Sequence, residues 1–388
     1  MNRIRQTRGE PPAFDLPHPT MASPELPIKP DQPWLAPLAG YTDLPFRLLC
    51  REFGAAAACT EMISAKGLVY QSPGTTRLGR TCPEDAPLVV QLFGSEPDTL
   101  RQALEMLMDM GHTFFDLNAG CPVKKVVKTG AGAALLQNPE VLARIVQKMV
   151  KVSGEGRLGV KIRAGWDRHS PGPVELAQRL EGSGAAWVTL HPRTARQGFS
   201  GRADWTLLRD VRERVVVPLL GSGDLFTAAD GMRCLSQTGI SGVMFARGAM
   251  ANPGVFDQLR RLVRAGRLLH DQEISGEHRP DEGSDSARHR PGRADCGRNG
   301  HILDSGGPET LSSLVSMAQR HIELCQAHEQ EGKAFLRMRT VLPRYFRGFA
   351  GARTLRSRIV DCRTWEELLH LVAGLPESIA EQVARKPD

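Results

Sequence analysis

Between residues 34 and 250, short apolar runs alternate with longer stretches of helical periodicity. Each apolar run has the length of a buried strand, and each stretch between runs is long enough for a helix that returns the chain to a parallel neighbour. The eight runs begin at Trp34, Gly54, Pro87, Phe114, Leu158, Ala185, Val217 and Gly242. Eight such units predict an α/β fold, a (β/α)8 TIM barrel, although an open doubly wound sheet would give the same alternation.

Two of the intervening stretches show how the crossover helices would pack. The first ends at Gly111, which suits the left-handed residue after a helix. The second begins with Asn138 as a helix cap and Pro139 in the first turn. The apolar positions are Leu100, Ala103, Leu104, Leu107 and Met108 in the first, and Val141, Leu142, Ile145, Val146 and Met149 in the second. Both patterns are typical of amphipathic helices that cover a parallel sheet.

Polar side chains come at the ends of the apolar runs and not at their starts. They are Glu61, Gln91, Asn118, Lys161 with Arg163, His191 with Arg193, Asp224, and Arg247. In a (β/α)8 barrel, the carboxyl ends of the strands and the loops after them form the active site. The pattern therefore predicts one mouth lined by residues from nearly every strand.

The chain of 388 residues is longer than one compact domain, so a second, smaller domain is expected. We predict a flexible leader over residues 1–30, the barrel over 31–270, a low-complexity linker over 271–308 and a small all-α helical domain over 309–388. The leader lacks the apolar stretch of a secretory signal, and no run reaches the ~18 apolar residues that span a bilayer. We therefore expect a cytoplasmic protein without membrane contact.

Eight cysteines are scattered along the chain, with no Cys-x-x-Cys pair and no cluster with histidines. This spacing argues against a disulfide framework and against a zinc site, so no metal is expected. Cys121 stands apart because it lies in a Gly-Cys-Pro turn after a strand-like run and before Lys124 and Lys125. A thiol in a cationic, partly open setting can take part in proton transfer, although most cysteines in turns are inert.

The net charge of +7 is a weak indication of a polyanionic partner. Residues 333–360 carry eight Lys or Arg and no acidic residue, and four aromatic residues lie among them. This combination is typical of a surface that contacts nucleic-acid phosphates, although a solvated helix face would look the same. Arg353, Arg356 and Arg358 are the candidate phosphate contacts.

Over residues 31–258 the chain resembles the bacterial tRNA-dihydrouridine synthases, with nine matching segments in the correct order. These are A-P-L-A-G-Y-T-D-L-P-F-R at 36–47, T-E-M at 60–62, Q-L-F-G at 91–94, N-A-G-C-P at 118–122, G-A-G-A-A-L-L at 130–136, K-I-R-A-G-W at 161–166, H-P-R-T at 191–194, G-S-G-D at 221–224 and A-R-G-A at 246–249. The stretch 338–356 is more loosely similar to the family's helical RNA-binding domain. The Gly-Cys-Pro segment looks closest to the B-type branch, which suggests the uridine at position 17.

The resemblance implies an FMN-dependent oxidoreductase that takes electrons from NADPH or NADH and acts on tRNA. Hydride would pass from flavin N5 to C6 of a uracil, and Cys121 would donate a proton to C5. The positions that match the family's FMN contacts are Ala36, Pro37, Leu38, Gln91, Lys161, His191, Ser222, Gly223, Asp224, Ala246, Arg247 and Gly248. The candidate substrate contacts are Asn118, Glu61, Arg163, Arg193, Lys124, Lys125, Arg353, Arg356 and Arg358.

Three positions depart from the family pattern: Leu38 replaces a common methionine, Ser222 an asparagine and Pro192 a glycine. Ser222 is therefore a weaker candidate for a cofactor contact than the asparagine would be, and Pro192 offers no backbone N–H. Two other functions fit the sequence, namely an FMN barrel oxidoreductase acting on a small molecule and a noncatalytic RNA-binding relative. The sequence gives no signal on assembly, and a monomer is our working expectation.

Overall fold

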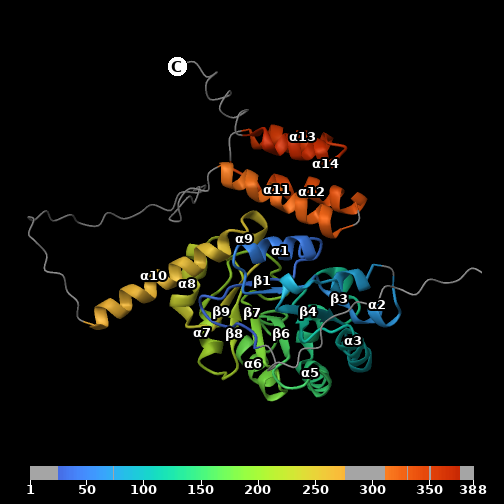
Figure 1. Cartoon of the computed structure of the whole chain (residues 1–388). Coiled ribbons are helices and arrows are strands. Elements are labelled where there is room, and N and C mark those ends of the chain that lie inside the picture. Colours follow the sequence, from blue (N-terminus) through green and yellow to red (C-terminus); the bar gives the residue numbers. More distant parts are fainter. Residues whose placement is uncertain (1–24, 73, 276–310, 330, 349–350, 376–388) are drawn as a thin grey trace, which may run out of the picture.

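The computed structural model describes residues 25–72, 74–275, 311–329, 331–348 and 351–375 (Figure 1). Nine parallel strands form one sheet that closes on itself, because β2 pairs with both β1 and β4. The strands are β1 (Trp34–Leu35), β2 (Ala57–Cys59), β3 (Ile63–Ser64), β4 (Leu88–Phe93), β5 (Phe114–Ala119), β6 (Leu158–Arg163), β7 (Trp187–His191), β8 (Leu219–Gly221) and β9 (Gly242–Phe245). Since β2 and β3 pair with successive parts of β4, they act as one interrupted strand of an eight-stranded barrel. The predicted TIM barrel is confirmed, and the open sheet is excluded.

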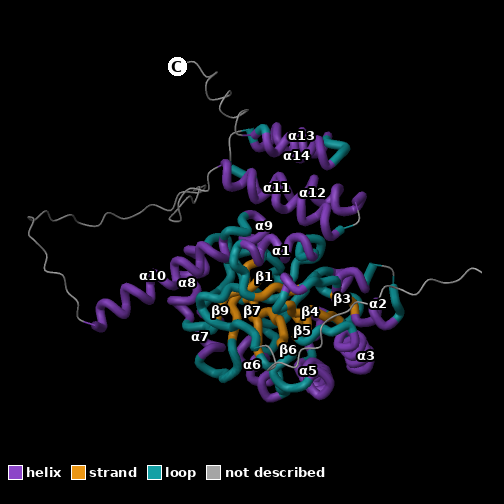
Figure 2. Tube along the Cα trace, viewed as in Figure 1, coloured by secondary structure: helices purple, strands orange, loops and turns teal. Residues whose placement is uncertain are grey.

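Helices surround this barrel on the outside, as Figure 2 shows. They are α1 (Leu44–Glu52), α2 (Ala65–Val69), α3 (Pro97–Asp109), α4 (Lys124–Val127), α5 (Pro139–Ser153), α6 (Pro173–Gly182), α7 (Thr206–Arg212), α8 (Ala228–Thr238), α9 (Arg247–Ala251) and α10 (Val255–Ser275), with 3-10 turns η1 (Thr76–Gly79), η2 (Pro83–Asp85) and η3 (Gly132–Gln137). The two predicted helices are α3 and α5. The Asn138 side chain caps α5 by accepting from the Val141 N–H at 3.1 Å, and Gly111 after α3 has φ +88°.

The amino-terminal half of the barrel interior is filled by large side chains. Trp34 and Trp187 meet edge to face there, with ring centroids 5.8 Å apart, in a cluster that includes Phe114. Gly159 makes room for this packing, because a Cβ at that position would lie 2.0 Å from the Trp187 ring. These side chains pack the amino-terminal half of the barrel, so a ligand site is expected toward the carboxyl ends of the strands.

The described part of the carboxyl-terminal region is all helical and packs beside α1 and α9 (Figure 1). It comprises α11 (Leu311–His328), α12 (Glu331–Tyr345), α13 (Ala352–Asp361) and α14 (Trp365–Ala373). Arg320 on α11 pairs with Glu52 on α1 at 2.7 Å. His321 is buried against Phe46, and its Nδ1 lies 2.8 Å from the Tyr345 hydroxyl. The predicted helical domain is confirmed, and it is anchored directly on the barrel.

Residues 1–24 of the predicted leader and residues 276–308 of the predicted linker lie outside the described residues. Helix α10 runs through Ser275, past the predicted start of the linker at 271. The domain boundaries therefore stay predictions. Among the helices of the described ranges, none is long and apolar enough to cross a membrane.

Candidate active site

A cavity of about 250 Å³ opens at the carboxyl ends of the barrel strands. It brings together most of the predicted site residues: Ala36, Pro37, Leu38, Gln91, Asn118, Cys121, Lys161, Arg163, His191, Ser222, Gly223, Asp224, Ala246 and Arg247. These residues come from β4 to β7 and from the segments that follow β1, β5, β8 and β9. One mouth shared by most strands is what the polar strand ends predicted.

The turn that carries Cys121 is held by side chains from β5 and β6. Asn118 Oδ1 accepts hydrogen bonds from the backbone N–H groups of Cys121, at 2.9 Å, and Gly120, at 3.2 Å. From the other side, Arg163 Nε donates to the Gly120 carbonyl at 2.9 Å. The half-buried Cys121 therefore stands on a backbone fixed at two adjacent residues.

The segment 130–136 supports the same turn from beneath. The Ala133 N–H donates to the Cys121 carbonyl at 2.9 Å. Gly132, at φ +61°, approaches so closely that a Cβ there would lie 2.7 Å from the Cys121 carbonyl oxygen. The glycine therefore lets η3 pack directly under the cysteine turn.

A buried polar chain crosses the cavity floor. Asn118 Nδ2 donates to Gln91 Oε1 at 2.8 Å, and Gln91 Nε2 donates to Asp116 Oδ2 at 2.7 Å. Burial raises the pKa of Asp116 and lowers that of Lys161, while their opposite charges act against both shifts. Asp116 Oδ1 has no hydrogen-bond partner among the described residues. Asp116 is thus buried outside the cavity lining and bonded to Gln91, whereas the half-buried Lys161 belongs to the lining itself.

Asp116 was not among the predicted site residues. Its signal in the sequence is an acidic residue inside the apolar run that begins at Phe114, two positions before Asn118 and thus on the same side of the strand. Which residues would neutralise this carboxylate depends on the register of β4, β5 and β6, and the sequence does not give that register.

At the far wall of the cavity, cations surround His191. Burial, and then the charges of Lys161, Arg163, Arg193 and Arg247, lower the pKa of His191 well below its ordinary value. The neutral imidazole is therefore favoured, in which one ring nitrogen donates a hydrogen bond and the other accepts one. Gly223 packs against this ring at φ +99°, and a Cβ there would lie 2.7 Å from His191 Cδ2.

Asp224 connects two arginines at this wall. Arg193 donates to both of its carboxylate oxygens, at 2.9 and 2.7 Å, and Arg247 Nη2 donates to Oδ1 at 3.1 Å. The Arg247 guanidinium lies over two phenylalanine rings, 5.1 Å from the Phe199 centroid and 4.8 Å from that of Phe226. Two arginines thus share one carboxylate, so a net positive charge remains for an anionic group.

Several predicted contacts lie outside the cavity lining. Glu61 is buried and accepts from the Gly40 N–H, which fixes the loop after β1. Arg193 is buried, with the Asp224 carboxylate and backbone carbonyls as its partners. The predicted residues that do not line the cavity are Glu61, Arg193, Gly248, Lys124, Lys125, Arg353, Arg356 and Arg358. Five of these residues are lysines or arginines on α4 and α13, and all five are exposed.

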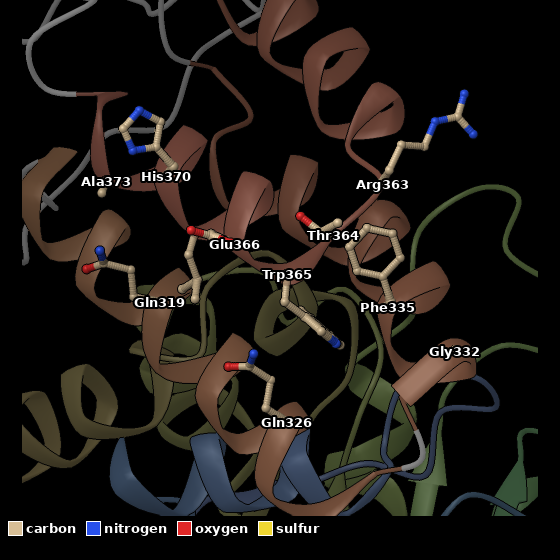
Figure 3. Close-up of a pocket in the computed structure, with 11 residues that line it drawn as sticks. Gln319, Gln326, Gly332, Phe335, Arg363, Thr364, Trp365, Glu366, His370 and Ala373 are labelled. Carbon is tan, nitrogen blue, oxygen red and sulfur yellow. The ribbon is translucent and has the colours of Figure 1, made fainter.

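A second hollow lies in the helical domain, between α11, α12 and α14 (Figure 3). Phe335 and Trp365 form part of its wall and meet edge to face, with centroids 5.2 Å apart. None of its lining residues belongs to the barrel, so it is separate from the cavity that contains Cys121.

The donor set of the barrel cavity fits a flavin cofactor. Gln91, Lys161 and His191 offer polar atoms to the edge of a planar heterocycle, and the buried Thr189 hydroxyl beside Lys161 in the sheet register lacks a partner among the described residues. At the α9 end, Gly223 and Arg247 offer the close backbone and the cation that barrels use for a phosphate. The described residues contain no group of three or more His, Cys, Asp or Glu suited to a metal ion.

Comparison with known proteins agrees with this geometry. The sequence model of the dihydrouridine synthase (Dus) family matches residues 34–279. A probable tRNA-dihydrouridine synthase of Treponema pallidum is 38% identical over 60% of this chain and 71% of its own length. Probable enzymes of that kind from Synechocystis, at 30% identity, and Mycobacterium tuberculosis, at 31%, each align with 86% of this chain and with 82% and 79% of their own lengths.

Proposed function

The chain belongs to the dihydrouridine synthase family, and on that premise we propose that it reduces a uridine of tRNA to 5,6-dihydrouridine. FMN would be its bound cofactor and NADPH its reductant. The observation that carries the proposal is the single cavity that Cys121 shares with Gln91, Lys161 and His191. It unites a proton donor with the polar set that a flavin requires.

Residues of the barrel mouth would hold the flavin. Ala36, Pro37 and Leu38 supply backbone along one wall, and Gln91, Lys161 and His191 supply hydrogen bonds to the ring edge. The charge of Lys161 favours the anionic reduced form. When bound, FMN supplies the hydride that reaches C6 of the uracil.

Cys121 would protonate C5 of the same pyrimidine ring. Asn118 and Arg163 hold the backbone of Gly120 and Cys121, so the thiol is kept in one place before substrate arrives. Such positioning matters because small displacements of a reacting group have large effects on rate. The Asn118 amide bonds to Gln91 and to this turn, so we propose that its first role is to position Cys121.

The helical domain would supply the contacts to tRNA phosphates. Arg353, Arg356 and Arg358 lie exposed on α13. Two other cations of the basic stretch are used differently: Arg337 pairs with Asp43, and Arg344 donates to the Tyr41 hydroxyl at 2.7 Å. Phosphate contacts would offset the few kcal/mol needed to extrude a stacked base into the cavity. We place this activity in the cytoplasm and keep position 17 as the predicted target.

The test is direct. Purified full-length protein should contain bound FMN, identified by chromatography after denaturation, and should form dihydrouridine in unmodified tRNA when NADPH is supplied. Mass spectrometry of nuclease fragments would locate the modified uridine. A flavin-loaded protein that oxidises NADPH and reduces a small enone or pyrimidine, but leaves tRNA unmodified, would contradict the proposal. A protein that binds tRNA without binding flavin would do the same.

A further inference from the structure

A large groove continues from the active-site cavity along the outside of the barrel, between α7 and α8. Its volume is about 1040 Å³, and it shares four residues with the cavity: Phe199, Asp224, Phe226 and Arg247. Sites for small organic ligands have volumes of roughly 300–1,000 Å³, so the groove has room for one. A ligand that begins in the cavity can therefore extend into the groove without leaving the protein surface.

Positive charge dominates the groove. Five arginines and three aspartates line it. Arg202 has no ion-pair partner among the described residues, Arg209 makes only a 3.5 Å contact with Asp210, and Arg233 pairs with Asp230 at the groove wall. The side chains of Arg209 and Arg233 stay 53% and 60% exposed, so their guanidinium groups are accessible to an anion.

Aromatic rings mark the end of the groove that joins the cavity. Phe199 is 61% exposed and Phe226 is 46% exposed, so both rings reach the surface. Trp205, also in the lining, is fixed because its Nε1 donates to the Gly223 carbonyl at 3.0 Å. Arg247 already lies over both rings, so a nucleobase could stack only on the faces that Arg247 leaves open, and arginines beside aromatic rings are a combination that binds a nucleobase and its phosphates.

We propose that this groove binds the phosphorylated adenosine half of the reductant, and that Arg202, Arg209 and Arg233 select NADPH over NADH. The proposal rests on the function proposed above, in which a nicotinamide ring enters the cavity to reduce the flavin. Arginine recognises phosphate through bidentate hydrogen bonds, and the additional 2′-phosphate distinguishes NADPH from NADH. Five arginines against three aspartates leave the groove with a net charge of +2, and Arg202 and Arg209 are its least paired cations.

A nucleotide of tRNA has the same chemistry, but the geometry favours the dinucleotide. The helical domain, which carries the exposed arginines of α13, packs on α1 and α9, and α7 lies well away from it in Figure 1. The groove also shares Asp224 and Arg247 with the cavity, so the two spaces adjoin directly. Its position therefore suits a molecule anchored in the cavity.

Two measurements on the flavin-loaded full chain test the proposal. The first is anaerobic stopped-flow reduction of the flavin by NADPH and by NADH, without tRNA. The second is calorimetric titration with adenosine 2′,5′-bisphosphate, which does not depend on activity. Loss of one phosphate contact should weaken binding by roughly tenfold. The triple change Arg202→Ser, Arg209→Ser and Arg233→Ser should raise the half-saturating NADPH concentration at least that much and leave the limiting rate within about twofold.

Controls separate this proposal from the proposed function. Arg144→Ser on α5 removes an exposed arginine outside the groove and should change neither measurement. In the triple variant, the half-saturating concentrations of NADPH and NADH should become similar, and the affinity for tRNA should stay at the wild-type value. Unchanged NADPH dependence, or loss of tRNA affinity instead, overturns the assignment of the groove. If wild-type flavin is reduced by neither dinucleotide, the proposed reductant fails, and absence of bisphosphate binding independently refutes the groove as a nucleotide site.

Discussion

Replacing Asn118 by alanine removes the side chain that joins the cysteine turn to the cavity floor. Four hydrogen bonds disappear: those from the N–H groups of Gly120 and Cys121, the one to Gln91 Oε1, and a long one to Met62 Sδ at 3.8 Å. Asn118 itself is only 7% exposed, whereas Gly120 and Cys121 are half-buried. Water can therefore reach part of the turn but little of the Gln91 amide.

The magnitude follows from this difference in burial. An unsatisfied buried group costs about 1–3 kcal/mol, and a group that water can reach costs much less. We expect a loss of about 2 kcal/mol in the free energy of unfolding. The rate of dihydrouridine formation should fall more than this loss of stability alone implies, because a displacement of about 1 Å in a reacting group can slow a reaction about 100-fold.

Urea unfolding gives the stability change, and single-turnover formation of dihydrouridine gives the rate. Asn138→Ala is the matched control, because Asn138 also accepts from a backbone N–H, at 3.1 Å, but caps α5 at an exposed position. It should cost about 1 kcal/mol and leave the rate unchanged. The reasoning is refuted if Asn118→Ala forms dihydrouridine within twofold of wild type.

Three further predictions concern other parts of the molecule. Changing Arg353, Arg356 and Arg358 together to serine should weaken tRNA binding and reduce its salt slope by about two to three, measured by filter binding across salt concentrations. Burial lowers the pKa of His321 in the folded protein from 6.5 to about 3. Between these two pH values, the imidazole is protonated in the unfolded chain but not in the folded protein. Stability should therefore fall as pH falls through this window, and His321→Phe should flatten the slope of unfolding free energy by up to about 1.4 kcal/mol per pH unit. Gly223→Ala should reduce bound FMN, measured by absorbance, because its Cβ would press on His191.

Each of these has its own control. Neutralising Arg353, Arg356 and Arg358 should leave flavin content intact, and an unchanged salt slope would assign them to ordinary surface. An unchanged pH slope in His321→Phe would show that another group dominates. Gly239→Ala also strains a positive φ, +63°, but its Cβ would enter open space, so FMN content should be normal. Equal FMN loss in both glycine variants would contradict the specific role of Gly223.

Local sequence signals predicted much of this fold. The apolar runs placed all eight barrel strands, since a buried parallel strand needs a continuous apolar stretch. Asn138 caps its helix as predicted because the bond it makes is only three residues away. The break between β2 and β3 was not predicted, because it depends on how each part pairs with β4.

The site was harder to predict where partners are distant in sequence. Arg193 stays a predicted substrate contact, but the sequence did not show that its side chain pairs with Asp224, a residue on the next strand's loop. The contact of Arg247, on α9, with the rings of Phe199 and Phe226 likewise joins a helix and two separate loops. Sequence patterns predict which residues reach the mouth of a barrel, whereas register and loop packing decide what they touch there.

The most direct test of the central claim is single-turnover reduction of tRNA by the flavin-loaded Cys121→Ala variant. The protein should retain FMN and accept electrons from NADPH, yet form dihydrouridine at least about 100-fold more slowly than wild type, since general acid catalysis contributes about 10²–10⁴-fold. Cys82→Ala, a change at another half-buried cysteine outside the cavity, should behave as wild type. Dihydrouridine formed at the wild-type rate by Cys121→Ala would contradict the account.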